Sequence, residues 1–200
     1  MDIVGSALLL VVTSPVFLVV AAAIKLDSPG PVFFKQTRVG RGGAEFTMVK
    51  FRSMVHDNDE SVHREYYRRF VEGRAESRRN EEGDEVFLLD DARVTRVGRI
   101  LRRTSLDELP NLLNVLRGEM SLVGPRPPIS YEVEFYDEHA LRKLLVKPGM
   151  TGLAQVSGRG ALTFDEVIGY DLDYIDRRSL RMDVGILLRT IPAVARRRGV

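Results

Sequence analysis

The sequence predicts an α+β protein that is predominantly helical, and three observations support this class. The chain of 200 residues opens with an almost uninterrupted apolar run over 3–24. Two stretches rich in β-branched and aromatic residues, 32–36 and 45–51, flank a glycine-rich loop, which is typical of a β-hairpin. Several later segments carry apolar residues at helical spacing. We therefore expect a long apolar helix, a small β-hairpin and a set of amphipathic helices.

The apolar run is interrupted at its middle by Ser14 and Pro15. Each half would be about 14–17 Å long as a helix, roughly half of the ~30 Å hydrocarbon core of a bilayer. Proline removes one backbone hydrogen bond and bends a helix, and the Thr13 and Ser14 hydroxyls can bond to the freed carbonyl groups. A re-entrant helix and a kinked spanning helix both fit this pattern. A cleaved signal peptide and a buried core helix fit less well, because no basic segment precedes the run and the remaining chain lacks a large apolar shell.

The composition narrows the classes of protein. Cysteine is absent, which excludes disulfides and cysteine-based metal sites. The 30 basic residues are nearly balanced by 28 acidic ones, and no nucleic-acid-binding motif is present, which argues against nucleic acid as a partner. Arginine clusters suit phosphate groups or anionic lipid headgroups, although solvated surfaces also carry them. The clusters are Arg38/Arg41, Arg93/Arg96/Arg99/Arg102/Arg103, Arg177/Arg178/Arg181 and Arg196–Arg198.

The rest of the chain alternates predicted helices with loops. Dense charge over 56–85 predicts a surface insertion that contains one helix. Further helices are expected over 93–103, 109–117, 129–145, 164–174 and 183–198, with Gly118 ending the second of them. The last helix combines apolar residues with arginines. This pattern is typical of a helix in a lipid headgroup layer and equally of a helix packed on a core.

The adjacent acids Asp107 and Glu108 are the first candidate for chemistry. Ser105 and Glu108 match a capping box, which would explain both residues as a helix start. That interpretation gives no role to Asp107, and five arginines lie just upstream of it, between residues 93 and 103. A helix N-terminus attracts phosphate and would keep Asp107 ionised. An ionised carboxylate at such a site is either a Mg²⁺ ligand or a nucleophile for phosphoryl transfer.

Three other stretches carry candidate phosphate-binding residues. Prolines and a glycine at 124–128 place Arg126 on a stiff backbone, which suits a bidentate phosphate contact. The glycine-rich stretch 147–160 allows a ligand to approach the backbone closely, and it also carries Arg159. Lys50 and Arg52 share one face of a strand and are able to bind a diphosphate. The alternatives are a tight turn with a solvated arginine for Arg126 and a solvated sheet edge for the Lys50 pair.

At these stretches the chain strongly resembles the bacterial sugar transferases, the monotopic phosphoglycosyl transferases that prime glycan assembly on polyprenyl phosphate. The resemblance extends from Asp2 to Val200. Its signatures, in order, are the Ser14-Pro15 interruption, KFRSM at 50–54, SLDELP at 105–110, GPRP at 124–127 and KPGMTG at 147–152. Together they are specific to the family, whereas no single one would be.

The resemblance implies the transfer of a hexose-1-phosphate from a UDP-sugar to undecaprenyl phosphate, with release of UMP and a requirement for Mg²⁺. This would be the first membrane step in assembling a glycoconjugate or exopolysaccharide. In the family the apolar segment is a re-entrant helix–break–helix that inserts into one leaflet from the cytoplasmic side. The resemblance therefore favours the re-entrant alternative, at the cytosolic face of the bacterial inner membrane.

The resemblance also implies roles for individual residues. Asp107 would attack the β-phosphate of the donor and form a covalent phosphosugar intermediate, and it is also the expected Mg²⁺ ligand. Glu108 would activate the acceptor phosphate or help to hold the metal. Arg126 and Arg159 match phosphate-binding arginines of the family. Lys50 and Asp183 match positions in or near its active site.

These inferences predict a re-entrant membrane helix at 1–26 and a catalytic domain at 27–200, with 56–85 as a charged surface insertion. Amphipathic interfacial helices would surround the active site. The expected partners are a UDP-sugar, undecaprenyl phosphate and membrane lipids, and no nucleic acid. The identity of the sugar, the oligomeric state and an earlier native start are left open. A competing hypothesis is a non-catalytic membrane-surface scaffold that binds anionic lipids, but it leaves Asp107, Glu108 and Arg126 unexplained.

Overall fold

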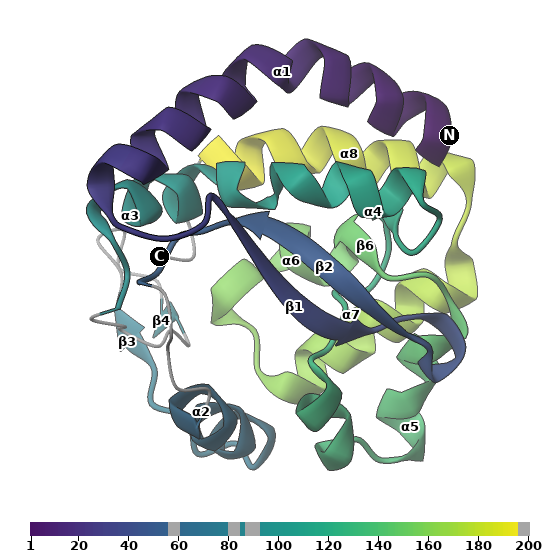
Figure 1. The fold of residues 1–200 in the computed structure, drawn as a ribbon. Helices are drawn as coiled ribbons and strands as arrows, with labels where there is room; N and C mark the ends of the chain where they lie inside the picture. The colour runs from purple at the N-terminus through teal and green to yellow at the C-terminus, as the bar shows by residue number, and fades with distance from the viewer. Residues whose placement is uncertain (56–60, 80–84, 87–92, 196–200) are drawn as a thin grey trace.

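The computed structural model describes residues 1–55, 61–79, 85–86 and 93–195 (Figure 1). Its α-helices are α1 (Asp2–Asp27), α2 (Ser61–Val71), α3 (Arg96–Thr104), α4 (Leu112–Leu116), α5 (Glu138–Leu141), α6 (Leu153–Ser157), α7 (Phe164–Arg177) and α8 (Leu180–Ala195). Its 3₁₀ turns are η1 (Arg41–Gly43), η2 (Leu106–Asn111), η3 (Ser130–Phe135), η4 (Arg142–Leu145) and η5 (Arg159–Ala161). Its strands are β1 (Phe33–Val39), β2 (Glu45–Phe51), β3 (Arg78–Arg79), β4 (Glu85–Val86), β5 (Ser121–Val123) and β6 (Gly149–Thr151). The predicted mainly helical α+β class is confirmed.

The predicted hairpin is also confirmed. Strands β1 and β2 pair antiparallel from Phe33↔Phe51 to Val39↔Glu45, so the first strand extends three residues beyond the expected 32–36. The connecting turn contains Gly42 and Gly43 at φ 70° and 81°, a region that only glycine adopts readily. A second, parallel pair joins β5 to β6. These short sheets position loops rather than form a continuous sheet.

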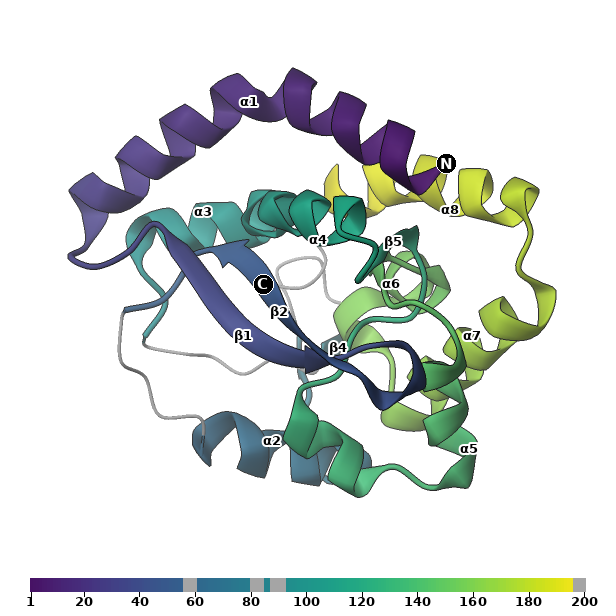
Figure 2. The same cartoon turned by 45° about the vertical axis from the view of Figure 1, so that its right-hand side comes forward.

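Helix α1 arches over one side of the molecule (Figures 1 and 2). It continues through Pro15 as one helix, so the expected break is a bend. Proline lacks an N–H group, and the carbonyl four residues before it, on Val11, loses its usual donor. The Ser14 hydroxyl donates to this carbonyl at 2.8 Å, and the Thr13 hydroxyl donates to Leu9 at 2.7 Å. The predicted bonding to a freed carbonyl is confirmed for Ser14, whereas Thr13 bonds to a carbonyl that Pro15 does not free.

Both ends of α1 are bonded to the rest of the chain. The Asp2 carboxylate accepts hydrogen bonds from the Ser121 hydroxyl at 3.1 Å and the Leu122 amide at 3.2 Å. At the other end, the Asp27 carboxylate accepts from the Val97 amide at 3.0 Å. Ser6, Val20 and Ile24 are the buried residues of the helix. The two ends therefore meet one globular body, with the bend between them.

The outer side of α1 is apolar and exposed. In the described chain, α1 alone is long and apolar enough to cross a membrane, and only 11% of its most apolar window is buried. A buried core helix is therefore ruled out for this segment. The large exposed apolar residues of α1 are Ile3, Val4, Leu8, Leu9, Val11, Val12, Leu18, Val19 and Leu26.

Two apolar clusters position the acid pair. The larger one lies between β2, α4, β5 and α8 and includes Met48, Met120 and Ile186. The second joins α1 to the hairpin and α3 through Val20, Ile24, Phe51 and Leu101, with Leu106 and Leu109 packed against it. Because these two leucines flank Asp107 and Glu108, their burial fixes the turn that carries the acids.

The helix predicted over 129–145 is wrong, because this segment is divided into η3, α5 and η4. Tyr136 has extended backbone angles, φ −84° and ψ 131°. Asp137 then caps the next turn, accepting from the Ala140 amide at 2.7 Å. Side chains that bond to nearby backbone groups compete with a continuous helix, and Asp137 does so here.

The other predicted helices differ mainly at their boundaries. The segment 109–117 begins later, as α4, because Pro110 lies in the preceding 3₁₀ turn, whereas Gly118 (φ 78°) follows its end as predicted. Helix α7 extends to Arg177 from a Thr163–Glu166 capping box, and α8 begins three residues early at Leu180. The final residues, 196–198, of the predicted last helix lie outside the described residues. Helix α2 is the helix expected within the charged insertion 56–85.

Candidate active site

The acid pair lies on η2, between α3 and α4. Ser105 has left-handed backbone angles (φ 54°, ψ 20°) that end α3 and redirect the chain. The Ser105 side chain makes no capping hydrogen bond, so the capping-box interpretation of Ser105 and Glu108 is wrong. Asp107 is only 9% exposed. The turn therefore presents two carboxylates whose side chains are not consumed by helix capping.

Glu108 is bound by residues of two elements. The Lys50 ammonium of β2 forms an ion pair with one carboxylate oxygen, and the Asn111 amide donates to the other at 2.5 Å. The side chain of Lys50 is 14% exposed and that of Glu108 is 33% exposed. Tertiary packing thus joins the KFRSM and SLDELP stretches, two of the motifs found in the sequence.

Arg52 does not share this site with Lys50. Its guanidinium donates to the backbone carbonyls of Ser28, at 2.8 Å, and Pro29. These bonds fix the turn between α1 and β1. The predicted use of Lys50 and Arg52 together for a diphosphate is therefore wrong, because Arg52 is buried and engaged with backbone carbonyls.

Arg126 is exposed on a loop that is held by hydrogen bonds to β1 on one side and to β6 on the other. On one side the Arg38 guanidinium donates to the Pro127 carbonyl at 3.0 Å, and the Val39 amide donates to Pro128 at 2.9 Å. On the other side the Gly149 amide donates to the Pro125 carbonyl at 2.8 Å. The guanidinium of Arg126 is close enough to the Lys50–Glu108 pair to affect the pKa of both groups.

Arg38 is a site residue that sequence reasoning did not single out. It appeared there only as a member of an arginine cluster. In the structure it is 5% exposed, and its Nε atom has no hydrogen-bond partner. Burial, together with the charge of Arg126, lowers the pKa of Arg38 to about 10. The sequence analysis ended the first strand at residue 36, so it gave no reason to expect that Arg38 would be buried near the acid pair.

The two acids have opposite pKa shifts. Burial and the charge of Glu108 raise the pKa of Asp107 to about 6, although Lys50 and Arg102 oppose the shift. Burial would also raise the pKa of Glu108, but Lys50 and Arg126 outweigh it and lower that pKa. The pKa of Asp107 is thus raised rather than lowered, because desolvation outweighs the nearby cations and η2 is only a short 3₁₀ turn. A pKa of about 6 is still compatible with the expected ionised carboxylate at neutral pH.

Two glycines of the 147–160 stretch allow a close contact between backbone segments. A Cβ atom at Gly149 would lie 2.0 Å from the Gly124 nitrogen, and one at Gly152 would lie 2.3 Å from the Gly124 oxygen. Gly149 and Gly152 therefore let the 147–160 stretch pack directly against the backbone of Gly124. They therefore support the loop that carries Arg126. The backbone of Arg159 lies in η5, but its side chain is outside the described part of the structure.

Asp183 lies on α8 with different neighbours. Its carboxylate accepts a hydrogen bond from the Tyr174 hydroxyl at 2.9 Å, and the same hydroxyl approaches the Val123 carbonyl at 3.2 Å. Burial and the charge of Asp183 raise the pKa of Tyr174. Among the described contacts, none joins Asp183 to Lys50, Glu108 or Arg126.

The residues around the acid pair fit a magnesium ion. Within the described residues, no three His, Cys, Asp or Glu side chains form a metal-binding group. Magnesium, however, is usually held by one or two carboxylates together with substrate phosphates. The Asp107 carboxylate and the buried Asn111 Oδ1, which has no hydrogen-bond partner, are oxygen ligands of the required kind.

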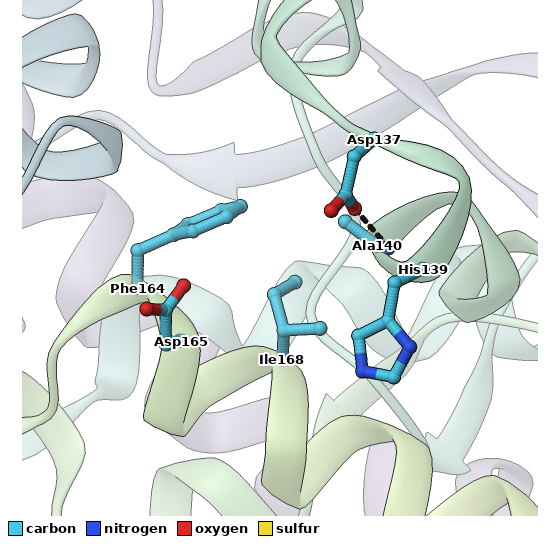
Figure 3. Close-up of a pocket in the computed structure, with 6 residues that line it drawn as sticks. All are labelled: Asp137, His139, Ala140, Phe164, Asp165 and Ile168. Atoms are coloured by element: carbon cyan, nitrogen blue, oxygen red, sulfur yellow. Dashed lines mark hydrogen bonds between the residues drawn. The ribbon is translucent and has the colours of Figure 1, made fainter.

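A separate cavity of about 260 Å³ lies between α5 and α7. It is lined by Asp137, His139, Ala140, Phe164, Asp165 and Ile168 (Figure 3). One of its carboxylates, on Asp137, is already bonded to the Ala140 amide. No residue predicted for the active site lines this cavity, so it is distinct from the acid pair.

Comparison with known proteins supports the motif analysis. The family model for bacterial sugar transferases matches residues 1–197. The exopolysaccharide production protein ExoY of Rhizobium meliloti is 41% identical over 198 residues, which cover 99% of this chain and 85% of that protein. A UDP-glucose:undecaprenyl-phosphate glucose-1-phosphate transferase of Caulobacter vibrioides is 44% identical, covering 97% of this chain and 68% of that protein.

A third relative acts on a different sugar. The undecaprenyl-phosphate galactose phosphotransferase of Salmonella typhimurium is 43% identical over 198 residues, which cover 99% of this chain and 40% of that protein. These matches extend along essentially the whole chain, including α1, the hairpin and the acid pair. The chain belongs to the bacterial sugar transferase family, and it is a transferase.

Proposed function

We propose that this protein transfers a hexose-1-phosphate from a UDP-sugar to undecaprenyl phosphate and releases UMP. The observation that carries the proposal is the Asp107–Glu108 pair, held beside Lys50 and near Arg38 and Arg126. Two acids and three bases leave positive charge in excess, which suits phosphate groups. Relatives named for glucose-1-phosphate and galactose phosphate transfer are 44% and 43% identical, so sequence identity does not select the sugar.

Asp107 is the nucleophile of the proposed reaction. With a pKa of about 6 its carboxylate is mostly ionised at neutral pH. An oxygen of this carboxylate attacks the sugar-bound phosphorus of the donor, and the bond between that phosphorus and the bridging oxygen breaks. UMP leaves with the electron pair of that bond. The acceptor phosphate then displaces Asp107, so the two substrates never need to share the site.

The proposed roles of three neighbouring residues are electrostatic, and none of them forms a covalent bond to a substrate. These residues are Lys50, Glu108 and Arg126. The carboxylate of Glu108 favours the protonated form of Lys50, which burial opposes. A fixed ammonium group and the exposed Arg126 guanidinium stabilise the charge that develops on the phosphate oxygens. Because Lys50 and Asn111 occupy both oxygens of Glu108, its main role is to orient Lys50.

Magnesium is the proposed cofactor, and Asp107 with Asn111 Oδ1 would hold it. When bound, it neutralises phosphate charge in the donor. The orphaned Asn111 oxygen supports this assignment, because buried polar atoms without partners are rare.

We further propose that α1 is re-entrant and that the protein lies on the cytosolic face of the bacterial inner membrane. Asp2 and Asp27 bond the two ends of α1 to one globular body, whereas a spanning helix would leave one end on the far side. The outer residues of α8, which include Leu180, Leu188 and Ile191, are exposed and apolar. They would lie in the headgroup region as an amphipathic helix.

The transferase reaction is tested by measuring UMP release from UDP-glucose, UDP-galactose and other UDP-sugars, with undecaprenyl phosphate and Mg²⁺. One donor should give turnover. Asp107→Asn should lower kcat by about 10³-fold or more, as for other catalytic nucleophiles. The matched variant Asp137→Asn changes a carboxylate in the separate α5–α7 cavity and should remain active. If Asp107→Asn releases UMP as fast as the parent, the assignment of the nucleophile is wrong.

The topology is tested with single cysteines, since the chain has none. In intact cells, a cysteine inserted between Met1 and Asp2 and the variant Leu26→Cys should both resist an impermeant thiol reagent. Both should react in inverted membrane vesicles, because re-entry places both ends on the cytosolic side. Val12→Cys, near the bend, should be protected in both preparations. Labelling of the inserted cysteine, but not of Leu26→Cys, in intact cells would show that α1 spans the membrane.

A further inference from the structure

One face of the hairpin carries a row of residues that begins in the active site. Phe34 pairs with Lys50, Gln36 with Met48 and Arg38 with Phe46. Directly paired residues of antiparallel strands point to the same face, with Cβ atoms about 4.5–5.5 Å apart. Phe34, Gln36 and Arg38 therefore share the face of Lys50. The bond of 2.7 Å from Arg38 to the Gln36 side chain agrees with this placement.

The chemistry of this face changes along the strand. At one end, Arg38 is bonded to the Arg126 loop through the Pro127 carbonyl. Lys50, with its partner Glu108, is next to Phe34 near the other end. Strand β1 begins beneath the C-terminal end of α1 and runs away from that helix (Figures 1 and 2). The face thus places Lys50 and the ring of Phe34 side by side at the end of the hairpin nearest α1 (Figures 1 and 2), whereas Met48, between them and the Arg38 end, is buried in the core.

Phe34 and Phe33 are consecutive aromatic residues, and each is 40% exposed. On the opposite face, the Phe33 ring stacks on Phe51 at 5.4 Å, and Phe51 in turn contacts Phe17 of α1 at 5.0 Å. For Phe34 there is no ring contact within the described part of the chain. A large apolar side chain that is exposed beside a partly exposed charged pair is suited to an amphiphilic ligand.

We propose that Phe34 binds the first isoprene units of the acceptor lipid, so that this face of the hairpin contacts both the phosphate and the beginning of the lipid chain. The inference rests on the proposed function and specifies the acceptor side of the same site. With the acceptor phosphate at Lys50 and Arg126, the chain passes Phe34 and enters the bilayer beside the C-terminal half of α1. Phe34 is then a specificity residue that favours prenyl phosphates over polar phosphates.

A kinetic test compares Phe34→Thr with the matched control Phe33→Thr, which changes the same residue type, equally exposed, on the opposite face. The whole protein is used in detergent micelles, with undecaprenyl phosphate and with the short, soluble geranyl phosphate as acceptors. Phe34→Thr should raise the KM for both acceptors about five- to tenfold, as for loss of part of an apolar contact. The burst of UMP formed without acceptor should be unchanged. Phe33→Thr should leave both acceptor KM values within about twofold of the parent, since its ring faces Phe51.

Two kinetic results would overturn the proposal. One is an unchanged acceptor KM in Phe34→Thr. The other is an increase of KM for undecaprenyl phosphate but not for geranyl phosphate, because general contact of the long chain with the micelle explains that result. Absence of turnover in the parent would instead count against the proposed function.

A binding test does not depend on turnover. The chain contains no tryptophan, so Phe34→Trp and Phe33→Trp each introduce one fluorophore. Geranyl phosphate should shift the emission of Phe34→Trp with saturation, whereas inorganic phosphate and geraniol should not, and Phe33→Trp should stay constant. Equal responses of the two variants, or a response to geraniol alone, would show that the probe merely enters the micelle and would refute a phosphate-anchored site.

Discussion

Two lysine–carboxylate ion pairs behave differently in this molecule, and only one of them is fully buried. Lys143 and Asp171 form an ion pair at 3.0 Å, with side chains 5% and 2% exposed, and Lys143 also lies 5.5 Å from the Tyr136 ring. Lys50 and Glu108 form the other pair. Burial opposes the charged form of both lysines, but the pKa of Lys143 is raised whereas that of Lys50 is lowered.

The difference comes from the surrounding charges. Tyr136 and Glu132 support the charge of Lys143 in addition to Asp171. Lys50 instead faces two further cations, Arg126 and Arg38. The charge of Lys143 is thus balanced by its neighbours, and the Lys143–Asp171 pair joins η4 to α7. The second pair carries excess positive charge that an anionic ligand would compensate. The two pairs thus differ both in burial and in the charges around them, and the uncompensated charge is the feature that suits the Lys50–Glu108 pair to an anionic ligand.

The largest expected effect is a loss of stability when the Lys143–Asp171 pair is broken. Lys143→Met leaves the Asp171 carboxylate, 1% exposed, buried without its partner. Removing one member of a buried pair costs about 3–5 kcal/mol of unfolding free energy. We expect a correspondingly lower thermal midpoint, measured by circular dichroism in micelles. The double variant Lys143→Met/Asp171→Leu should recover much of the loss, since no unpaired charge remains. If the single variant is as stable as the parent, the pair is not structural.

At the second pair the main effect should be on catalysis. Lys50→Met removes a preorganised cation from the phosphate site and should lower kcat/KM by about 10²–10³-fold. Its thermal midpoint should fall less than that of Lys143→Met, because Glu108 remains 33% exposed and hydrated. Steady-state UMP release and thermal unfolding of the two variants provide the comparison. Equal activity per folded molecule in Lys50→Met and Lys143→Met would remove the distinction between the pairs.

A smaller effect is expected in the pH dependence. The burst of UMP formed without acceptor should rise through pH 6 as Asp107 ionises, because its pKa is about 6. Glu108→Gln should move the rise to lower pH, since the charge of Glu108 raises this pKa, and Lys50→Met should move it to higher pH. Omitting the acceptor removes the titration of its phosphate from the profile. A profile that is identical in the parent and Glu108→Gln would contradict the assignment to Asp107.

The same pKa shift has a defined effect on stability. Because folding raises the pKa of Asp107, the folded state binds the proton more tightly than the unfolded state. This contribution to stability is fully present below the unfolded pKa, near pH 4. It is lost as the pH rises through about 6. We therefore expect the protein to lose stability in the pH range where Asp107, the proposed nucleophile, becomes ionised.

Local features of the fold could be predicted because neighbouring residues encode them. The bend at Pro15, its repair by the Ser14 hydroxyl and the hairpin all depend on residues a few positions apart. The predictions of local structure were wrong where a side chain bonds to a distant residue, or to a different nearby residue, from the one expected. Asp137 capped a new turn inside an expected helix, and Glu108 bonded to Lys50 instead of capping with Ser105. In each case one side chain had two chemically reasonable partners.

The sequence by itself determined the apolar helix, the position of its bend, the hairpin and the acid pair, because periodicity and motif spacing are properties of consecutive residues. Only the tertiary structure decided which cations join the acids. It placed Arg38, near the turn of the hairpin, close to them, and directed Arg52, just past the end of β2, to backbone carbonyls that follow α1. The bonds that settle this, Lys50 to Glu108 and Arg38 to Pro127, join residues 58 and 89 positions apart. Electrostatic interactions depend on distance in space, which residue spacing along a chain does not fix.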